Sequence, residues 1–352
     1  MKYGKLPPSP SEEGKYPIWS GYRYVGMADS FNCTKGTMVV VARGVGGTGD
    51  VKIAKEDCYL TNLSISVDVN TKVCNPYYLH YKYSIKNLRY LDSGSAQSQI
   101  TIDALKNLVI EIPPLAYQNK VVDVLKSLDD KIEVNRRIND NLEQQAQALF
   151  KSWFVDFEPF RDGEFVDSEL GRIPKGWRVQ ELGDMSRMNA GGDKPQSISE
   201  VLTDTCKVPI YSNGLDNNGL YGFTNEARII EPAVTISARG TIGDVNLRLT
   251  PYCPIVRLIS VIPNASVSIY YLYYALKNKK IEGVGTTQQQ LTVPNFKREK
   301  LIIPFIEIVD AFKSKIEPLI RKMRINDKES RRLATLRDTL LPKLMSGELK
   351  VN

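Results

Sequence analysis

The residues with the clearest chemical pattern are the glycines of Gly44–Gly49, which match G-x-G-x-x-G, a phosphate-binding sequence of dinucleotide and methyl-donor sites. In such sites the glycine-rich turn opens a helix. Here Asp50–Ile53 continues as an alternating strand, and the equivalent loop in a later repeat, Gly240–Gly243, lacks the pattern. We therefore predict a glycine-rich hairpin rather than a cofactor site.

Other candidates for catalysis are sparse. Asn75–Tyr78 reads Asn-Pro-Tyr-Tyr and lacks the second proline of the amino-methyltransferase tetrapeptide. His80 is the single histidine, which argues against a histidine triad or a multi-histidine metal site, and we predict that it is structural. The five cysteines lack paired spacing, and no P-loop or nuclease pattern occurs. We expect no catalytic residue, no metal and no cofactor in this chain.

The bulk composition indicates an ordinary soluble protein. The chain has 352 residues, 42% of them hydrophobic, and a formal net charge of +7, which suggests two or three domains and favours a polyanionic partner. No apolar run reaches the length of a membrane span, and the start lacks a signal-peptide core. We expect a cytoplasmic protein without a membrane partner.

Two long stretches predict paired helices. Leu115–Phe154 contains no glycine or proline, and Ile306–Leu341 contains no glycine and one proline. In both, apolar side chains recur at steps of three and four, as in a heptad seam. The predicted seam residues are Leu125, Leu128, Ile132, Asn139, Leu142, Leu149, Leu319, Met323, Asn326, Leu333, Leu336 and Leu340.

Each stretch also carries the tetrapeptide Arg-Ile-Asn-Asp, at 137–140 and 324–327. A buried asparagine in each seam would fix a single register of the two helices. The alternative is that both asparagines are exposed and that the repetition reflects ancestry alone.

The segments ahead of the two stretches resemble each other, which predicts a tandem duplication of a globular domain followed by a long helix. The matched blocks are Pro17–Gly21 and Pro209–Gly214, Ala42–Gly44 and Ala238–Gly240, Gly49–Val51 and Gly243–Val245, Gly94–Ile102 and Gly285–Val293, and Ile112–Pro114 and Ile303–Phe305. Because Ile173–Val179 has no counterpart near the start, we expect the first copy to be incomplete at its N-terminus. The predicted parts are a first copy at 1–114, a helix at 115–156, a connector at 157–172, a second copy at 173–305, and a helix with a tail at 306–352.

Two related modules beside stiff helices would hold two objects at a set distance. If each copy reads DNA, a helix of about 60 Å limits the separation to about 18 base pairs. The target would then be bipartite.

The order of these blocks resembles the specificity (S) subunit of Type I restriction-modification systems. The resemblance rests on Ile173–Trp177, on the Gly-x-x-Gln-x-x-Leu-Thr block at 285–292, on Leu149–Phe154 and on Leu341–Leu349. It implies an α+β protein with two tandem α/β target recognition domains. Two long conserved helices, packed as an antiparallel coiled coil, would separate these domains.

The resemblance also implies partners. The chain would be a non-catalytic subunit that binds double-stranded DNA, two methylation subunits and restriction subunits. S-adenosylmethionine, ATP and Mg would be held by those partner subunits. Two alternatives stay open, which are an autonomous DNA methyltransferase or nuclease and a coiled-coil scaffold that binds no DNA.

The duplication sorts the candidate DNA-binding residues, because residues shared by the copies suit phosphate contacts and divergent ones suit base readout. Arg43 and Arg239 are shared and would clamp phosphates, or else pack over a turn. The shared glutamines would contact DNA or cap the backbone, and they are Gln97, Gln99, Gln288 and Gln290. The divergent candidates for base readout are Tyr22, Arg23 and Tyr24 in the first copy and Asp216, Asn217, Asn218 and Tyr221 in the second.

Overall fold

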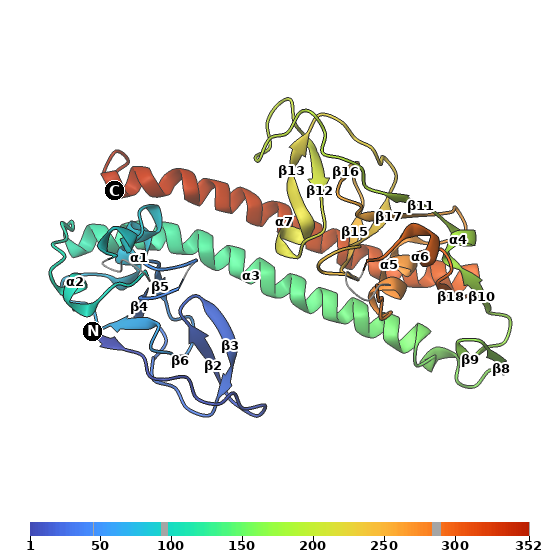
Figure 1. Ribbon diagram of the computed structural model, residues 1–352, viewed down its shortest axis with the longest axis horizontal. Coiled ribbons are helices and arrows are strands. Elements are labelled where there is room, and N and C mark those ends of the chain that lie inside the picture. The colour runs from blue at the N-terminus through green and yellow to red at the C-terminus, as the bar shows by residue number, and fades with distance from the viewer. Residues whose placement is uncertain (45, 93–97, 284–289, 352) are drawn as a thin grey trace. The chain divides into compact units, whose positions relative to one another are not determined.

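The chain folds into two compact units in a computed structural model that describes residues 1–44, 46–92, 98–283 and 290–351 (Figure 1). The first unit contains Met1–Arg136 and Asp327–Asn352, and the second contains Arg137–Asn326. The division cuts both long helices, α3 (Leu115–Phe154) and α7 (Ile306–Ser346), close to their Arg-Ile-Asn-Asp repeats. Each unit therefore holds one globular copy and part of each helix.

The first copy is built on two sheets. In the order β1-β7-β4-β5, every pair of neighbours is antiparallel. In the order β3-β2-β6, β3 is antiparallel and β6 is parallel to β2. The strands are β1 (Lys2–Tyr3), β2 (Tyr16–Ser20), β3 (Arg23–Ala28), β4 (Met38–Val41), β5 (Val51–Ile53), β6 (Tyr59–Leu60) and β7 (Ser64–Val67).

Short helices complete this copy. They are α1 (Pro76–Ile85), the 3-10 helix η1 (Leu88–Leu91) and α2 (Ile102–Lys106). The Asn75 side chain caps α1 by accepting a hydrogen bond from the Tyr77 amide at 2.9 Å, and Pro76 supplies the first helical residue. On this helix His80 Nδ1 lies 2.7 Å from the Val51 carbonyl oxygen, so the single histidine joins α1 to the sheet.

The second copy repeats this topology, with sheets in the orders β11-β17-β14-β15 and β13-β12-β16. The directions of all paired strands are the same as in the first copy. The strands are β11 (Ser186–Ala190), β12 (Val208–Tyr211), β13 (Leu220–Thr224), β14 (Ala233–Ile236), β15 (Val245–Arg248), β16 (Cys253–Pro254) and β17 (Ile259–Pro263). The matching orders confirm the duplication predicted from the sequence.

The second unit also contains elements outside the two repeated sheets. β8 (Phe165–Ser168) and β9 (Gly171–Pro174) form a hairpin, and β10 (Arg178–Glu181) pairs with β18 (Lys300–Ile303). The helices are η2 (Glu158–Phe160), α4 (Leu182–Met185), η3 (Asp216–Gly219), α5 (Ile269–Lys277) and α6 (Val293–Phe296). Trp177, just before β10, is buried against the aromatic rings of Phe154 and Phe160.

The two long helices pack in opposite directions in each unit. In the first unit, Asn135 Nδ2 donates to the Glu329 carboxylate at 2.8 Å, whereas Tyr117, earlier in α3, donates to the Leu344 carbonyl at 3.2 Å. In the second, Asn326 Nδ2 donates to Asn139 Oδ1 at 2.8 Å, and the ring centre of Phe154, later in α3, lies 5.0 Å from that of Phe312, earlier in α7. Residues later in α3 thus meet residues earlier in α7, which is the expected antiparallel coiled coil.

Most predicted seam residues are buried or half-buried. Leu125 and Asn326 are buried, and a larger group is half-buried, namely Leu128, Ile132, Asn139, Leu142, Leu149, Leu319, Met323, Leu333 and Leu340. Leu336 is 46% exposed, so its predicted place in the seam was wrong. Its neighbour Arg337 faces α3 instead and pairs with Asp129 at 2.6 Å.

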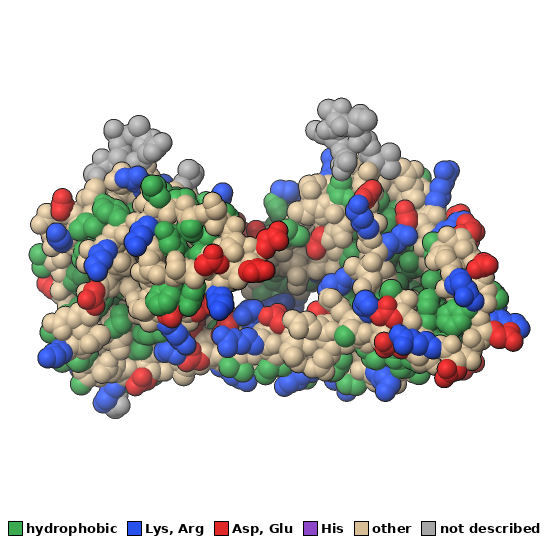
Figure 2. Space-filling view, turned by 90° about the horizontal axis from the view of Figure 1, so that it is seen from below, with side chains coloured by type: hydrophobic (Ala, Val, Ile, Leu, Met, Phe, Trp, Pro, Cys, Tyr) green, Lys and Arg blue, Asp and Glu red, His purple; other side chains and the backbone are tan. Residues whose placement is uncertain are grey.

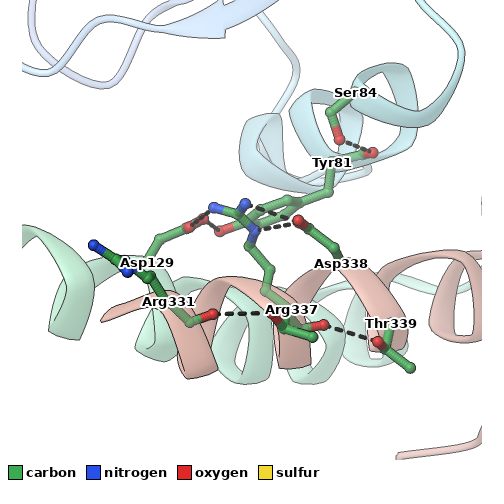
Figure 3. Close-up of polar contacts among 8 residues, drawn as sticks. Tyr81, Ser84, Asp129, Arg331, Arg337, Asp338 and Thr339 are labelled. Carbon is green, nitrogen blue, oxygen red and sulfur yellow. Dashed lines mark hydrogen bonds and ion pairs between the residues drawn. The ribbon is translucent and has the colours of Figure 1, made fainter. Parts of the chain in front are cut away.

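A polar cluster joins the first copy to its parts of the long helices (Figure 3). The Tyr81 hydroxyl on α1 donates to Asp129 Oδ2 of α3 at 2.6 Å, and Arg337 Nη1 of α7 donates to Asp129 Oδ1 at 2.6 Å. Arg337 Nε also donates to Asp338 at 2.9 Å. One carboxylate therefore connects three helices of the first unit.

Candidate nucleic-acid interface

In the first copy the turn between β2 and β3 packs on the glycine-rich loop that joins β4 to β5. Tyr22 is half-buried, and a Cβ atom added to Gly47 would come within 3.0 Å of its ring. Added Cβ atoms at Gly44 and Gly46 would also meet this ring. Because β5 follows the loop, the predicted hairpin is confirmed, and its glycines give the tyrosine room to pack.

The next two predicted residues lie on the surface of β3. The Arg23 guanidinium lies 5.1 Å from the centre of the Tyr22 ring. Tyr24 is 54% exposed, with its ring centre 6.0 Å from that of Trp19 in an edge-on arrangement. An exposed arginine and an exposed aromatic ring can contact phosphates, base edges or bases.

Arg43 lies next to this turn and beside Gln99. Arg43 and Gln99 form an antiparallel bridge, and the Ile100 amide donates to the Ala42 carbonyl at 2.9 Å. The backbone amide of Gln99 also donates to Asp92 Oδ1 at 2.7 Å. Gln97, predicted to contact DNA, lies outside the described residues.

The second copy brings the equivalent residues together. The Leu291 amide donates to the Ala238 carbonyl at 2.9 Å, as Ile100 does to Ala42 in the first copy. Arg239 Nη2 donates to Gln290 Oε1 at 3.0 Å. Gln288 lies outside the described residues. Each copy therefore holds a shared arginine and a shared glutamine side by side.

The divergent turn of the second copy lies beside the corresponding segment of that copy, which follows β14. Its residues Asp216, Asn217 and Asn218 are exposed in η3, and the two asparagines have left-handed φ angles of 48° and 54°. Asparagine tolerates this conformation better than other side chains apart from glycine. Upstream of η3, Asn213 Oδ1 accepts from the Ala238 amide at 2.8 Å, which connects the turn to the strand that precedes Arg239.

Arg248 fixes this turn, although no motif in the sequence pointed to it. Its Nη2 donates to the Asn218 carbonyl at 2.6 Å, its Nε donates to Thr235 Oγ1 at 3.0 Å, and its guanidinium lies 3.5 Å from the centre of the Tyr211 ring. Only 7% of Arg248 is exposed, and burial lowers its pKa. Its position as the last residue of β15 gave no signal of burial.

Tyr221, the last predicted residue, lies on the surface of β13 with a basic neighbour. Lys194 Nζ donates to the Tyr221 hydroxyl and lies 4.4 Å from the ring centre. Tyr221 is exposed, so the pair presents a positive charge beside an aromatic face. Lys194 was not predicted either.

Charged side chains of both signs lie on one face of the molecule. On the face drawn in Figure 2, Lys and Arg side chains are interspersed with Asp and Glu and do not form one continuous basic surface. Among the described residues, no group of three His, Cys, Asp or Glu side chains could hold a metal ion. No helix in the described ranges is long and apolar enough to cross a membrane.

The sequence matches a known family over both copies. Residues 2–144 and 174–333 match the model of the Type I restriction modification DNA specificity domain. The chain belongs to this family.

Named members of the specificity-domain family align with most of the chain. The Type I restriction enzyme MjaIX specificity subunit of Methanocaldococcus jannaschii is 31% identical and covers 90% of this chain and 78% of its own length. The HindI specificity subunit of Haemophilus influenzae is 29% identical, and the alignment covers 71% of each chain.

A solved member of the specificity-domain family has the same fold. The crystal structure of the Type I restriction-modification system S subunit from M. genitalium has a TM-score of 0.60 at 20% identity, covering 97% of this chain and 92% of that one. The architecture of two recognition domains and two long helices is therefore that of the family.

Proposed function

We propose that this protein is the DNA sequence-specificity subunit of a Type I restriction-modification complex and that it recognises a bipartite target. Family membership supports the role. The observation that carries the bipartite target is that both copies place a shared arginine and glutamine beside a divergent turn, Arg43 and Gln99 in one and Arg239 and Gln290 in the other. One such surface in each copy suits one half-site each.

The shared and divergent residues would then have separate tasks. Arg43 and Arg239 contact the DNA backbone, since guanidinium groups bind phosphate in any sequence. Arg23 and the asparagines of η3 read bases, because arginine suits guanine and asparagine suits adenine in the major groove. Substitutions in the first group should weaken both specific and non-specific binding, and those in the second should alter the recognised sequence.

The chemistry would belong to partner subunits. We propose that two methylation subunits bind this chain and supply S-adenosylmethionine, and that restriction subunits join them and use ATP and Mg. This chain would hold none of these cofactors and would perform no catalysis. Because its target is cellular DNA, we place the complex in the cytoplasm.

Sequencing the methylated bases of cells that express the complete system tests this proposal. We expect methylation at a split motif with a fixed gap. Exchanging Pro17–Ile100 for the equivalent segment of a relative should change one half of the motif only. Methylation of a continuous motif, or a change in both halves, would contradict the assignment of one half-site to each copy.

A binding assay tests the backbone contacts. In the complex with methylation subunits, Arg239→Ala should weaken binding to duplex DNA and lower the slope of log affinity against log salt by about one. Lys280→Ala is a matched control, because Lys280 is exposed and pairs with nearby Glu282. An unchanged slope for Arg239→Ala would remove this residue from the phosphate contacts.

The helices can be tested as a spacer by shortening both together. Asn135 faces Glu329 and Ser330 across the helix pair. Deleting residues 132–138 and 325–331 together removes one heptad from each helix and keeps the seam in phase. The gap should shrink by about three base pairs while both halves stay the same. An unchanged gap would show that the helices do not set the spacing.

The enzymatic and scaffold alternatives predict other results. Binding of S-adenosylmethionine by this chain alone, measured by calorimetry, would favour an autonomous methyltransferase. Failure of the assembled complex to bind duplex DNA at low salt would favour a scaffold.

A further inference from the structure

Two buried cysteines face each other across a short antiparallel bridge in the first copy. The Cys33 amide donates to the Cys58 carbonyl at 3.0 Å, and the Cys58 amide donates to the Cys33 carbonyl at 2.9 Å. Residues that exchange both bonds have Cα atoms about 5.5 Å apart, which lies within the range that a disulfide spans. The backbone therefore already has the spacing that a disulfide needs.

The side chains of this pair also meet, and both are free thiols. The Cys58 thiol donates a hydrogen bond to the Cys33 sulfur, and this bond lowers the pKa of Cys33 and raises the pKa of Cys58. The thiolate is the nucleophilic form of cysteine, and Cys33 is the member of the pair that forms it more readily. The two sulfur atoms are thus in contact and unequal in reactivity.

The pair lies in a small apolar cluster with Val39, apart from the larger core of this copy. The chain on either side of the bridge reaches the surface, where Lys35 and Glu56 are exposed. A small oxidant therefore needs only a local opening of this corner to reach the sulfur atoms, and the larger core can stay closed.

The second copy has the same bridge without the thiols. Ile229 and Tyr252 exchange both backbone hydrogen bonds there, at 3.0 and 2.9 Å. The fold therefore forms this bridge with other side chains and does not require cysteine. The paired thiols are a property of the first copy alone.

We propose that Cys33 and Cys58 are a redox modification site, at which a hydroperoxide converts the two thiols into a disulfide. The Cys33 thiolate attacks one peroxide oxygen, which breaks the O–O bond and forms a sulfenic acid on Cys33. The other oxygen takes up a proton and leaves as water or an alcohol. The Cys58 sulfur then attacks the Cys33 sulfur, so that the S–S bond forms as the S–O bond breaks, and the displaced oxygen leaves as water with the Cys58 proton.

The disulfide closes residues 34–57 into a loop that contains β4, β5 and the turn between them. Such a link stabilises a protein mainly by restricting its unfolded chain. β4 and β5 should therefore open less often in the oxidised protein. Only the consequence for DNA, which follows from the place of Arg43 in this loop, rests on the proposed function, and formation of the disulfide does not.

Peptide mapping of the full chain tests the site. The reduced protein is treated with hydrogen peroxide, catalase removes the excess, and the protein is alkylated in denaturant and digested for mass spectrometry. We expect peptides joined through Cys33 and Cys58 that separate under dithiothreitol, while Cys74, Cys206 and Cys253 are alkylated. Alkylation of all five cysteines, sulfinic acid without a link, or a link to another cysteine would overturn the proposal.

Matched variants assign the order of attack. In Cys58→Ala the sulfenic acid has no second thiol to meet, and dimedone should label Cys33 about fivefold more than it labels Cys58 in Cys33→Ala. Cys74→Ala is the control, because Cys74 is buried elsewhere in the same copy and its loss should leave the link intact. Equal dimedone labelling in the two variants would overturn the assignment of Cys33 as the attacked thiol.

Hydrogen exchange of the linked protein measures the restraint. The amides of β4 and β5 should exchange about tenfold more slowly than in the reduced protein. Their equivalents in the second copy, β14 and β15, should be unchanged and serve as the internal control. Equal exchange of β4 and β5 in the two forms would overturn the restraint.

Discussion

The two recognition domains share their sheet order, yet the layer between their sheets differs in polarity. In the first domain Val39, Cys58 and Leu60 form an apolar cluster, with Ala54 packed against it. In the second domain the positions matching Val39, Cys58 and Ala54 hold Thr235, Tyr252 and Arg248. One backbone plan thus supports either an apolar or a hydrogen-bonded interior.

The polar interior reaches the divergent turn. Arg248 connects Thr235 on β14 to the Asn218 carbonyl in η3, and the Tyr252 hydroxyl donates to Ser260 at 2.8 Å. Burial raises the pKa of Tyr252 to about 12, so this hydroxyl keeps its proton at neutral pH. The conformation of a divergent turn can thus be set from inside a domain while the shared blocks maintain its topology.

The domains also differ in how they join the long helices. In the second unit the Tyr274 hydroxyl donates to Glu143 of α3 at 3.0 Å, as Tyr81 does to Asp129 in the first. The basic partner of Glu143 is Lys277 of α5, at 2.6 Å, whereas that of Asp129 is Arg337 of α7. The polar cluster of the first unit therefore includes a residue of α7, whereas that of the second unit includes residues of α3 and α5.

The largest effect should come from the buried arginine. Arg248→Met leaves the Asn218 carbonyl without its donor and should destabilise the second unit by about 2 kcal/mol. Hydrogen exchange should show faster exchange in η3 and no change in the first unit. The control Arg187→Met removes an exposed ion pair and should cost less than about 1 kcal/mol. Equal costs for both variants would refute the role given to the polar interior.

The next effect distinguishes the two helix connections. Arg337→Met should lower amide protection in the part of α7 after residue 327 by about 1 kcal/mol, because Asp129 and Arg337 are both partly exposed. Lys277→Met should leave protection of α7 unchanged. Hydrogen exchange of both variants measures the amide protection of α7. Loss of that protection in Lys277→Met would contradict the proposed difference between the two helix connections.

A smaller effect depends on pH. Burial raises the pKa of Glu143, but hydrogen bonds from Gln147 and Lys277 outweigh burial and the pKa lies below its ordinary value. The ionised carboxylate therefore stabilises the second unit above the ordinary pKa, and this contribution is lost as pH falls through the lower folded-state pKa. Urea unfolding from pH 7 down to about pH 3.5 should show a steeper loss for the natural protein than for Glu143→Gln. Parallel curves would contradict this prediction.

The smallest effect concerns the surface pair of the second domain. Lys194→Met removes a cation beside Tyr221 and should change the free energy of unfolding by less than about 0.5 kcal/mol. Thermal unfolding measures it, with Lys207→Met as an exposed control. A loss above about 1 kcal/mol would mean that the pair holds the strand in place.

The sequence predicted the features that depend on local pattern. The absence of glycine located both long helices, and the matched blocks located both globular copies. Burial of a charged side chain was not predictable. The sequence around Arg248 and Arg239 does not distinguish them, and only the fold buries the first and exposes the second. The predicted seam position of Leu336 was wrong for a related reason. The aliphatic stem and the charge of Arg337 allow that residue to face α3 and pair with Asp129 instead. The DNA contacts proposed for both domains stay predictions.

The second unit is one uninterrupted segment, and the chain enters it and leaves it next to the same tetrapeptide. Transplanting Arg137–Asn326 from a relative would therefore exchange an entire folded body with two junctions, both inside helix. No sheet would be cut by such a graft. The first unit cannot be exchanged as one continuous segment, because its helix pair is completed by residues from the far end of the polypeptide.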